Sequence, residues 1–106
     1  MARYTNFFKV PRPSSSLRDS LVSSLKSCDL NMVYEAADYL VAKEKPGQVS
    51  LSQLATVEVL INPPTTESAE AKVNLVVKNE ELALSANNHC HRIFEVVNEA
   101  IEAAAV

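Results

Sequence analysis

The clearest constraint on this chain is the alternation of side chains between Ala71 and Lys78. Val73, Leu75 and Val77 fall at odd positions, and Lys72, Asn74, Val76 and Lys78 fall at even positions. Successive side chains of a strand point to opposite faces, so this segment predicts a strand with one buried and one exposed face. A sheet containing it needs cover on one side only, which is typical of antiparallel sheets.

Other segments also have strand character. Tyr4–Val10 is rich in aromatic and β-branched residues and is ended by two prolines. Leu30–Ala36 and Asp38–Glu44 predict a hairpin that turns between Glu35 and Asp38. A long strand with a bulge near Ser52–Leu54 is expected from six apolar residues of one parity: Val49, Leu51, Ala55, Val57, Val59 and Ile61.

Two segments have the spacing of amphipathic helices. The first carries Leu17, Leu21, Leu25 and Cys28 on one stripe; it follows three candidate N-cap serines, Ser14, Ser15 and Ser16, and ends near Asp29. The second begins between Ser85 and Asn88 and has the longer stripe, made of Cys90, Ile93, Phe94, Val97, Ile101 and Ala104. Between the strands, Pro46 and Gly47 predict a type II turn in which the glycine takes a positive φ.

The order of elements predicts an α+β two-layer sandwich, β-α-β-β-β-β-α. A crossover through the first helix makes the first two strands parallel, and a meander then brings the fifth strand beside the first. The expected result is an antiparallel-dominated five-stranded sheet of order 1-5-4-3-2 with two helices on one face. Its 106 residues suit a single domain, 1–106. This layout resembles the TATA-binding-protein-like class and its helix-grip relatives.

Charge and cysteine content exclude several functions. The net charge is −3, which makes a nucleic acid partner unexpected. The one group of Lys and Arg residues is Arg3, Lys9, Arg12 and Arg18, which we interpret as a solvated edge in preference to a phosphate-binding site. Cys28 and Cys90 are too few and too far apart for a disulfide framework or a zinc site. No apolar run approaches the roughly 20 residues that cross a bilayer, so we expect no membrane contact and a cytoplasmic location. A single glycine leaves no phosphate-cradling loop.

Candidate catalytic and metal-binding residues are few. His89 and His91 project about 200° apart on a helix and cannot grip one ion, while His91 with Glu95 makes at most a weak two-ligand site. The stripe position of Cys90 predicts burial, which disfavours a nucleophile, although a helix N-terminus favours one. We interpret five glutamates as solvated: Glu80, Glu81, Glu95, Glu99 and Glu102. The sequence therefore predicts no catalytic residue, no metal and no cofactor.

The more informative feature is the uncovered face of the sheet. There the alternation leaves four apolar side chains that could form a patch rimmed by Lys43, Glu58, Lys72 and Asn74; the four are Phe7, Val41, Leu60 and Val76. We therefore expect a non-enzymatic interaction module that uses this face for self-association or a protein partner. The alternative is a small apolar-ligand-binding protein, whose cavity between sheet and C-terminal helix would be lined by Phe94, Val97, Val59 and Leu75.

Most of the chain is also similar to one family. The segments Met1–Thr5, Asp38–Gly47, Thr56–Ile61, Asn74–Glu81 and Asn88–Cys90 resemble those of a group of short, uncharacterised conserved cyanobacterial proteins. The resemblance implies a cyanobacterial cytosol. It lends no catalytic residues.

Overall fold

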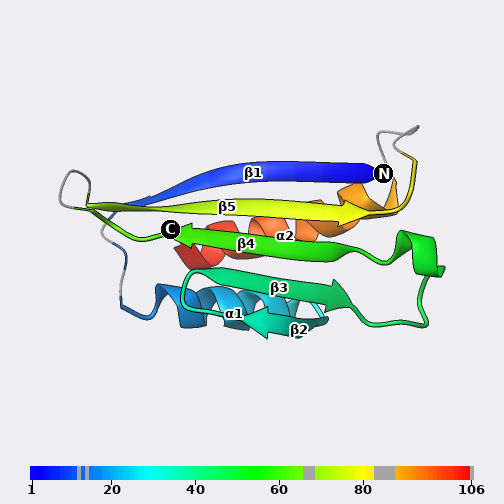
Figure 1. Ribbon diagram of the computed structural model, residues 1–106, viewed down its shortest axis with the longest axis horizontal. Coiled ribbons are helices and arrows are strands. Elements are labelled where there is room, and N and C mark those ends of the chain that lie inside the picture. Colours follow the sequence, from blue (N-terminus) through cyan, green and yellow to red (C-terminus); the bar gives the residue numbers. More distant parts are fainter. Residues whose placement is uncertain (12, 14, 66–68, 83–87, 106) are drawn as a thin grey trace.

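Five strands form one antiparallel sheet in the order β1-β5-β4-β3-β2, as predicted (Figure 1). The computed structural model describes residues 1–11, 13, 15–65, 69–82 and 88–105. Its elements are β1 (Ala2–Pro11), α1 (Leu17–Ser27), β2 (Leu30–Glu35), β3 (Tyr39–Glu44), the 3₁₀ helix η1 (Leu51–Gln53), β4 (Thr56–Asn62), β5 (Glu70–Asn79) and α2 (His89–Ala105). The α+β class is confirmed.

Both helices cover the same face of this sheet (Figure 1). Helix α2 packs against β1 and β5, and α1 packs against β2 and α2. Between the layers lie the largest fully buried side chains, Leu21, Leu25, Leu40, Val57, Val59, Val73, Leu75, Val77, Cys90, Val97 and Ile101. The odd positions of β4 and β5 therefore point into the core, as the alternation predicts.

Strand β1 is held to α2 by its even-numbered side chains. The Tyr4 ring lies 4.9 Å from the His91 ring and 5.8 Å from the Phe94 ring, centroid to centroid. The Tyr4 hydroxyl accepts a hydrogen bond from Asn88 Nδ2 at 2.8 Å. Asn88 also accepts the backbone N–H of His91 at 2.8 Å, which is the bond expected of a helix N-cap. The predicted start of this helix between 85 and 88 otherwise lies outside the described residues.

The prediction of one long strand through residues 49–61 is wrong before Thr56. Leu51 is 82% exposed and belongs to η1 instead of a strand. Ser50 and Gln53 form a capping box at the start of this short helix. Such local side-chain bonds compete with sheet pairing, so the shared parity of Val49 and Leu51 with β4 is a coincidence of spacing.

Smaller differences occur at the helix and turn boundaries. Helix α1 ends at Ser27, and Asp29 takes a left-handed φ of 63° just beyond it. Ser16 occupies the N-cap position without a side-chain capping bond, and Ser14 lies outside the described residues. Gly47 has a φ of 111°, which confirms the predicted positive φ.

The end of β5 is tied to the start of α2 by hydrogen bonds to Glu81. One Glu81 carboxylate oxygen accepts the Cys90 backbone N–H at 2.9 Å and the Asn79 side-chain amide at 2.6 Å. Burial raises the pKa of Glu81, but the hydrogen bonds from Asn79, Cys90, Gln53 and His89 together outweigh it and leave the pKa below the ordinary 4.5. The prediction of a solvated glutamate is wrong at Glu81, which is half-buried.

A second tie anchors the first residue of α2 to β3. The His89 Nε2 lies 2.7 Å from Glu44 Oε1, which also accepts the Ala55 backbone N–H at 2.8 Å. Both side chains are 12% exposed. The Glu44 carboxylate therefore joins β3, α2 and the Ala55 backbone within the fold.

We predict that Glu81→Gln makes the free energy of unfolding less dependent on acid pH. A carboxylate whose pKa is lowered by folding stabilises the protein above its unfolded pKa, and that stabilisation is lost as pH falls through the folded-state pKa. Chemical denaturation between about pH 6 and about pH 3 measures this difference. Glu80→Gln, at an exposed neighbour, is the matched control; equal pH slopes in the two variants would contradict the prediction.

Candidate functional site

One face of the sheet carries no described helix, and we call it the open face. Alternate residues of each strand point to this face, and the residues between them point into the core. They are Arg3, Thr5, Phe7, Lys9 and Pro11 from β1; Glu70, Lys72, Asn74, Val76 and Lys78 from β5; Thr56, Glu58, Leu60 and Asn62 from β4; Tyr39, Val41 and Lys43 from β3; and Asn31 and Tyr34 from β2.

The four predicted interaction residues all lie on the open face, and we call them the apolar quartet. Phe7 is 46% exposed and Leu60 is 41% exposed, whereas Val41 and Val76 are half-buried. They come from four neighbouring strands, β1, β5, β4 and β3. Cross-strand register makes them diagonal neighbours, about 7 to 8 Å apart between Cα atoms, so they form a zigzag across the sheet.

The sequence predicts Asn74 on the rim of the patch, but this residue lies inside the zigzag. It is the direct cross-strand partner of both Phe7 and Leu60. Direct partners in adjacent strands lie closer together than diagonal ones. The quartet is therefore apolar with a polar amide between two of its members.

Glu58 also lies inside the zigzag, as the direct partner of the two valines. It accepts a hydrogen bond from the Tyr39 hydroxyl at 2.6 Å and forms an ion pair with Lys78 at 3.1 Å. The Tyr39 bond is the main cause that lowers the Glu58 pKa; burial opposes it, and the charges of Lys78 and Arg3 reinforce it. The same bond raises the Tyr39 pKa. Glu58 is thus ionised and neutralised by its neighbours.

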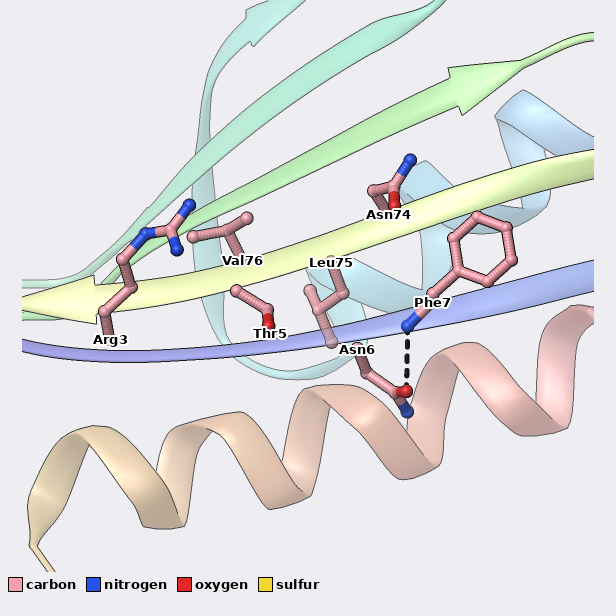
Figure 2. Close-up of a pocket in the computed structure, with 7 residues that line it drawn as sticks. All are labelled: Arg3, Thr5, Asn6, Phe7, Asn74, Leu75 and Val76. Atoms are coloured by element: carbon pink, nitrogen blue, oxygen red, sulfur yellow. Dashed lines mark hydrogen bonds between the residues drawn. The ribbon is translucent and has the colours of Figure 1, made fainter.

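A hollow of about 520 Å³ opens over β1 and β5 on this face. Figure 2 shows Arg3, Thr5 and Phe7 of β1 beside Asn74 and Val76 of β5. The hollow joins a guanidinium group, a hydroxyl, an amide, a phenyl ring and a valine. Asn6 and Leu75 complete the lining, which therefore offers both polar and apolar contacts.

The outer edge of β1 is closed at its centre by Asn6, which the sequence prediction did not single out. The Phe7 backbone N–H donates to Asn6 Oδ1 at 2.8 Å, on the side of β1 away from β5 (Figure 2). Asn6 Nδ2 donates to Asn98 Oδ1 of α2 at 2.6 Å. Edge strands with free amides invite pairing with another chain, and here the central amide is occupied. The sequence feature that could have revealed this role is the polar Asn6 among the inward-facing side chains of β1.

The other candidate residues do not converge. Cys90 is fully buried, as predicted, and its Sγ lies 3.5 Å from the Val77 carbonyl oxygen. Burial first, and then the charges of Glu81 and Glu44, raise the Cys90 pKa to about 11. The raised pKa keeps the thiol protonated at neutral pH, whereas a nucleophile needs the thiolate.

The two histidines that flank this cysteine serve different neighbours. His89 pairs with Glu44. The His91 Nδ1 lies 2.9 Å from Glu95 Oε1, an ion-pair distance without hydrogen-bond alignment. Within the described ranges, no group of three metal-ligating side chains could hold an ion. The remaining predicted surface glutamates, Glu80, Glu95, Glu99 and Glu102, are exposed.

The four residues expected to line the alternative ligand cavity belong to the hydrophobic core. Val59, Leu75 and Val97 are fully buried in one continuous core cluster, and Phe94 packs against it. These side chains are thus unexposed or only partly exposed, and the exposed apolar side chains of the quartet make the open face the candidate site.

Comparisons with known proteins assign no family. No protein-family model and no curated protein matches the chain. A solved structure, TTHA0849 from Thermus thermophilus, is similar at 9% sequence identity with a TM-score of 0.42; the match covers 99% of this chain and 100% of that one. Among the described helices, none has both the length and the apolar character needed to cross a bilayer.

We predict that Asn6→Ala opens the β1 edge to self-association. The substitution frees the Phe7 amide and removes the bond to Asn98, so the edge gains an unpaired donor that a second copy can satisfy. Sedimentation velocity at increasing concentration should show a larger species for this variant. Thr5→Ala is the matched control; a concentration-independent mass for Asn6→Ala would count against an edge-closing role.

We predict that a thiol reagent distinguishes the two free cysteines. Cys28 is half-buried and Cys90 is buried, so Cys28 should react in the native protein and Cys90 only on unfolding. Ellman's reagent on the Cys28→Ser variant measures Cys90 alone. Rapid stoichiometric reaction of that native variant would revive a nucleophilic role for Cys90.

Proposed function

We propose that the chain is a non-enzymatic interaction module that binds a protein partner through its open face. The observation that carries this proposal is the apolar quartet, which extends over four adjacent strands on the face that neither described helix covers. Protein interfaces combine apolar contacts with polar groups, and the quartet offers both, because Asn74 and Glu58 lie between its members. The two free cysteines suit a reducing cytoplasm.

The energy available from the quartet supports a modest interaction. Phe7 and Leu60 each leave a little under half of their surface exposed. Covering the exposed half of such a side chain contributes about 1 kcal/mol, since complete burial is worth about 1.5 to 3 kcal/mol. This gain is small beside the entropic cost of association, so polar and charged contacts around the quartet must supply the remainder.

The occupied Phe7 amide at the centre of the β1 edge also favours binding on the face. A partner that added a strand to β1 would have to displace the Asn6 oxygen from the Phe7 amide. A partner that lies across the open face leaves this bond intact. Binding on the face therefore costs less free energy than adding a strand to β1, because no existing hydrogen bond of the edge is broken.

Selection from a random peptide display library tests the proposal. Peptides enriched on immobilised wild-type protein should bind about tenfold or more weakly to a Leu60→Lys, Val76→Lys double variant, because two lysines then occupy the centre of the face. The matched control is Leu51→Lys with Val96→Lys, two exposed apolar residues outside the open face.

Circular dichroism melts of both double variants separate binding from folding. The proposal fails when no peptide is enriched over bare support. It also fails when the selected peptides bind the open-face variant as tightly as the wild type.

A further inference from the structure

We infer that the partner is a peptide segment with acidic residues on both sides of an apolar centre, lying along β1 and β5. This inference rests on the proposed function and names the chemistry of the partner. It follows from how charge is distributed over the open face, from the cross-strand register, and from the hollow between the two strands.

The open face is basic although the chain is acidic. It carries five of the ten Lys and Arg residues and, among its described acids, only Glu58 and Glu70. The described residues of this face therefore carry a net charge of +3. Since the whole chain has a net charge of −3, the remainder carries −6. A surface of opposite sign to the rest of the molecule attracts an acidic partner and orients it.

Four successive cross-strand rows form what we call the β1–β5 strip. Its two ends are basic, with Arg3 opposite Lys78 at one end and Lys9 opposite Lys72 at the other. The two rows between them pair Thr5 with Val76 and Phe7 with Asn74. The hollow of Figure 2 lies over this centre.

The spacing of the strip fits an extended segment. Arg3 and Lys9 are six positions apart on one strand, which is about 20 Å. A peptide in extended conformation would place two carboxylates about six residues apart over these ends. Its intervening apolar side chains would then contact Phe7 and Val76.

The Lys9 and Lys72 row is the part of the strip that most needs a partner. Lys9 and Lys72 are direct cross-strand partners of like charge, an arrangement that destabilises a sheet. No described carboxylate lies within ion-pair distance of either one. At the other end, Lys78 already pairs with Glu58. An incoming carboxylate would relieve the repulsion between Lys9 and Lys72.

A second copy in a face-to-face dimer fits less well, because each face brings a charge of +3. A single nucleic acid strand would also meet basic ends. Single-strand binding relies on aromatic rings on which successive bases stack, and Phe7 is the one ring of the strip, beside the aliphatic Val76. The mixture of one ring, one valine and one amide favours a peptide.

Fluorescence anisotropy with two synthetic peptides tests the inference. The first probe has glutamates at both ends of a leucine- and phenylalanine-containing centre, and the second has lysines in place of the glutamates. We expect the acidic probe to bind wild-type protein, more weakly as salt rises. We expect binding to fall about tenfold in the Lys9→Glu, Lys72→Glu variant, because two favourable charge pairs become repulsive.

The matched control reverses two cations outside the open face, Lys26→Glu with Lys45→Glu, and should leave affinity unchanged. Equal binding of both probes, or equal affinity of the Lys9→Glu, Lys72→Glu variant and wild type, overturns the inference. So does tighter binding of a labelled oligouridylate than of the acidic probe. A wild-type dimer in sedimentation that Leu60→Lys with Val76→Lys dissociates overturns it as well.

These outcomes are separable from those of the proposed function. Display peptides that are lost on the Leu60→Lys, Val76→Lys variant but bind the Lys9→Glu, Lys72→Glu variant normally would refute the acidic partner and keep the interaction module. Failure to select any peptide would refute both.

Discussion

The alternation of side chains in β4 and β5 is the constraint on which the rest of the structure depends. Val57 and Val59 of β4, and Val73, Leu75 and Val77 of β5, are fully buried beneath the helices. Because the side-chain period of a strand is two, a slip of one residue would expose this whole set and bury the charged one. Strand β5 pairs with both β1 and β4, so its register also decides which side chains of those strands meet on the open face.

This dependence explains which parts of the fold could be predicted from sequence. The hydrophobic pattern repeats every two residues in β5 and every 3.6 residues in α2, and these repeats suffice to predict which face of each element is buried. The crossover geometry suffices to predict the order of the strands. Residues 49–55 were mispredicted because Leu51 shares the parity of β4, while the capping box of Ser50 and Gln53 holds the backbone in a 3₁₀ turn. The role of Glu81 was also missed, since its partners Asn79 and Cys90 meet it only once β5 and α2 are in place.

The candidate site shows the same division. The apolar quartet could be predicted because each member is an apolar residue at a solvent-facing position of its own strand. Its internal arrangement could not, because the register inserts Asn74 and Glu58 between its members. The pairing of Lys9 with Lys72 is likewise invisible in the sequence, where the two residues lie in different halves of the chain. A basic face on an acidic chain arises only when strand parity sorts the charges.

The central claim is that ligand contact is confined to the open face, and methyl resonances test it most directly. Neighbouring valines in β5 report on opposite faces, because Val76 lies on the open face and Val77 is fully buried. On titration with an acidic-ended peptide, the account predicts the largest chemical-shift changes at the methyl groups of Val76, which lies in the β1–β5 strip, with those of Val59, Val77 and Val97 unchanged. Larger changes at Val97, or changes confined to the exposed Val96 of α2, would contradict it.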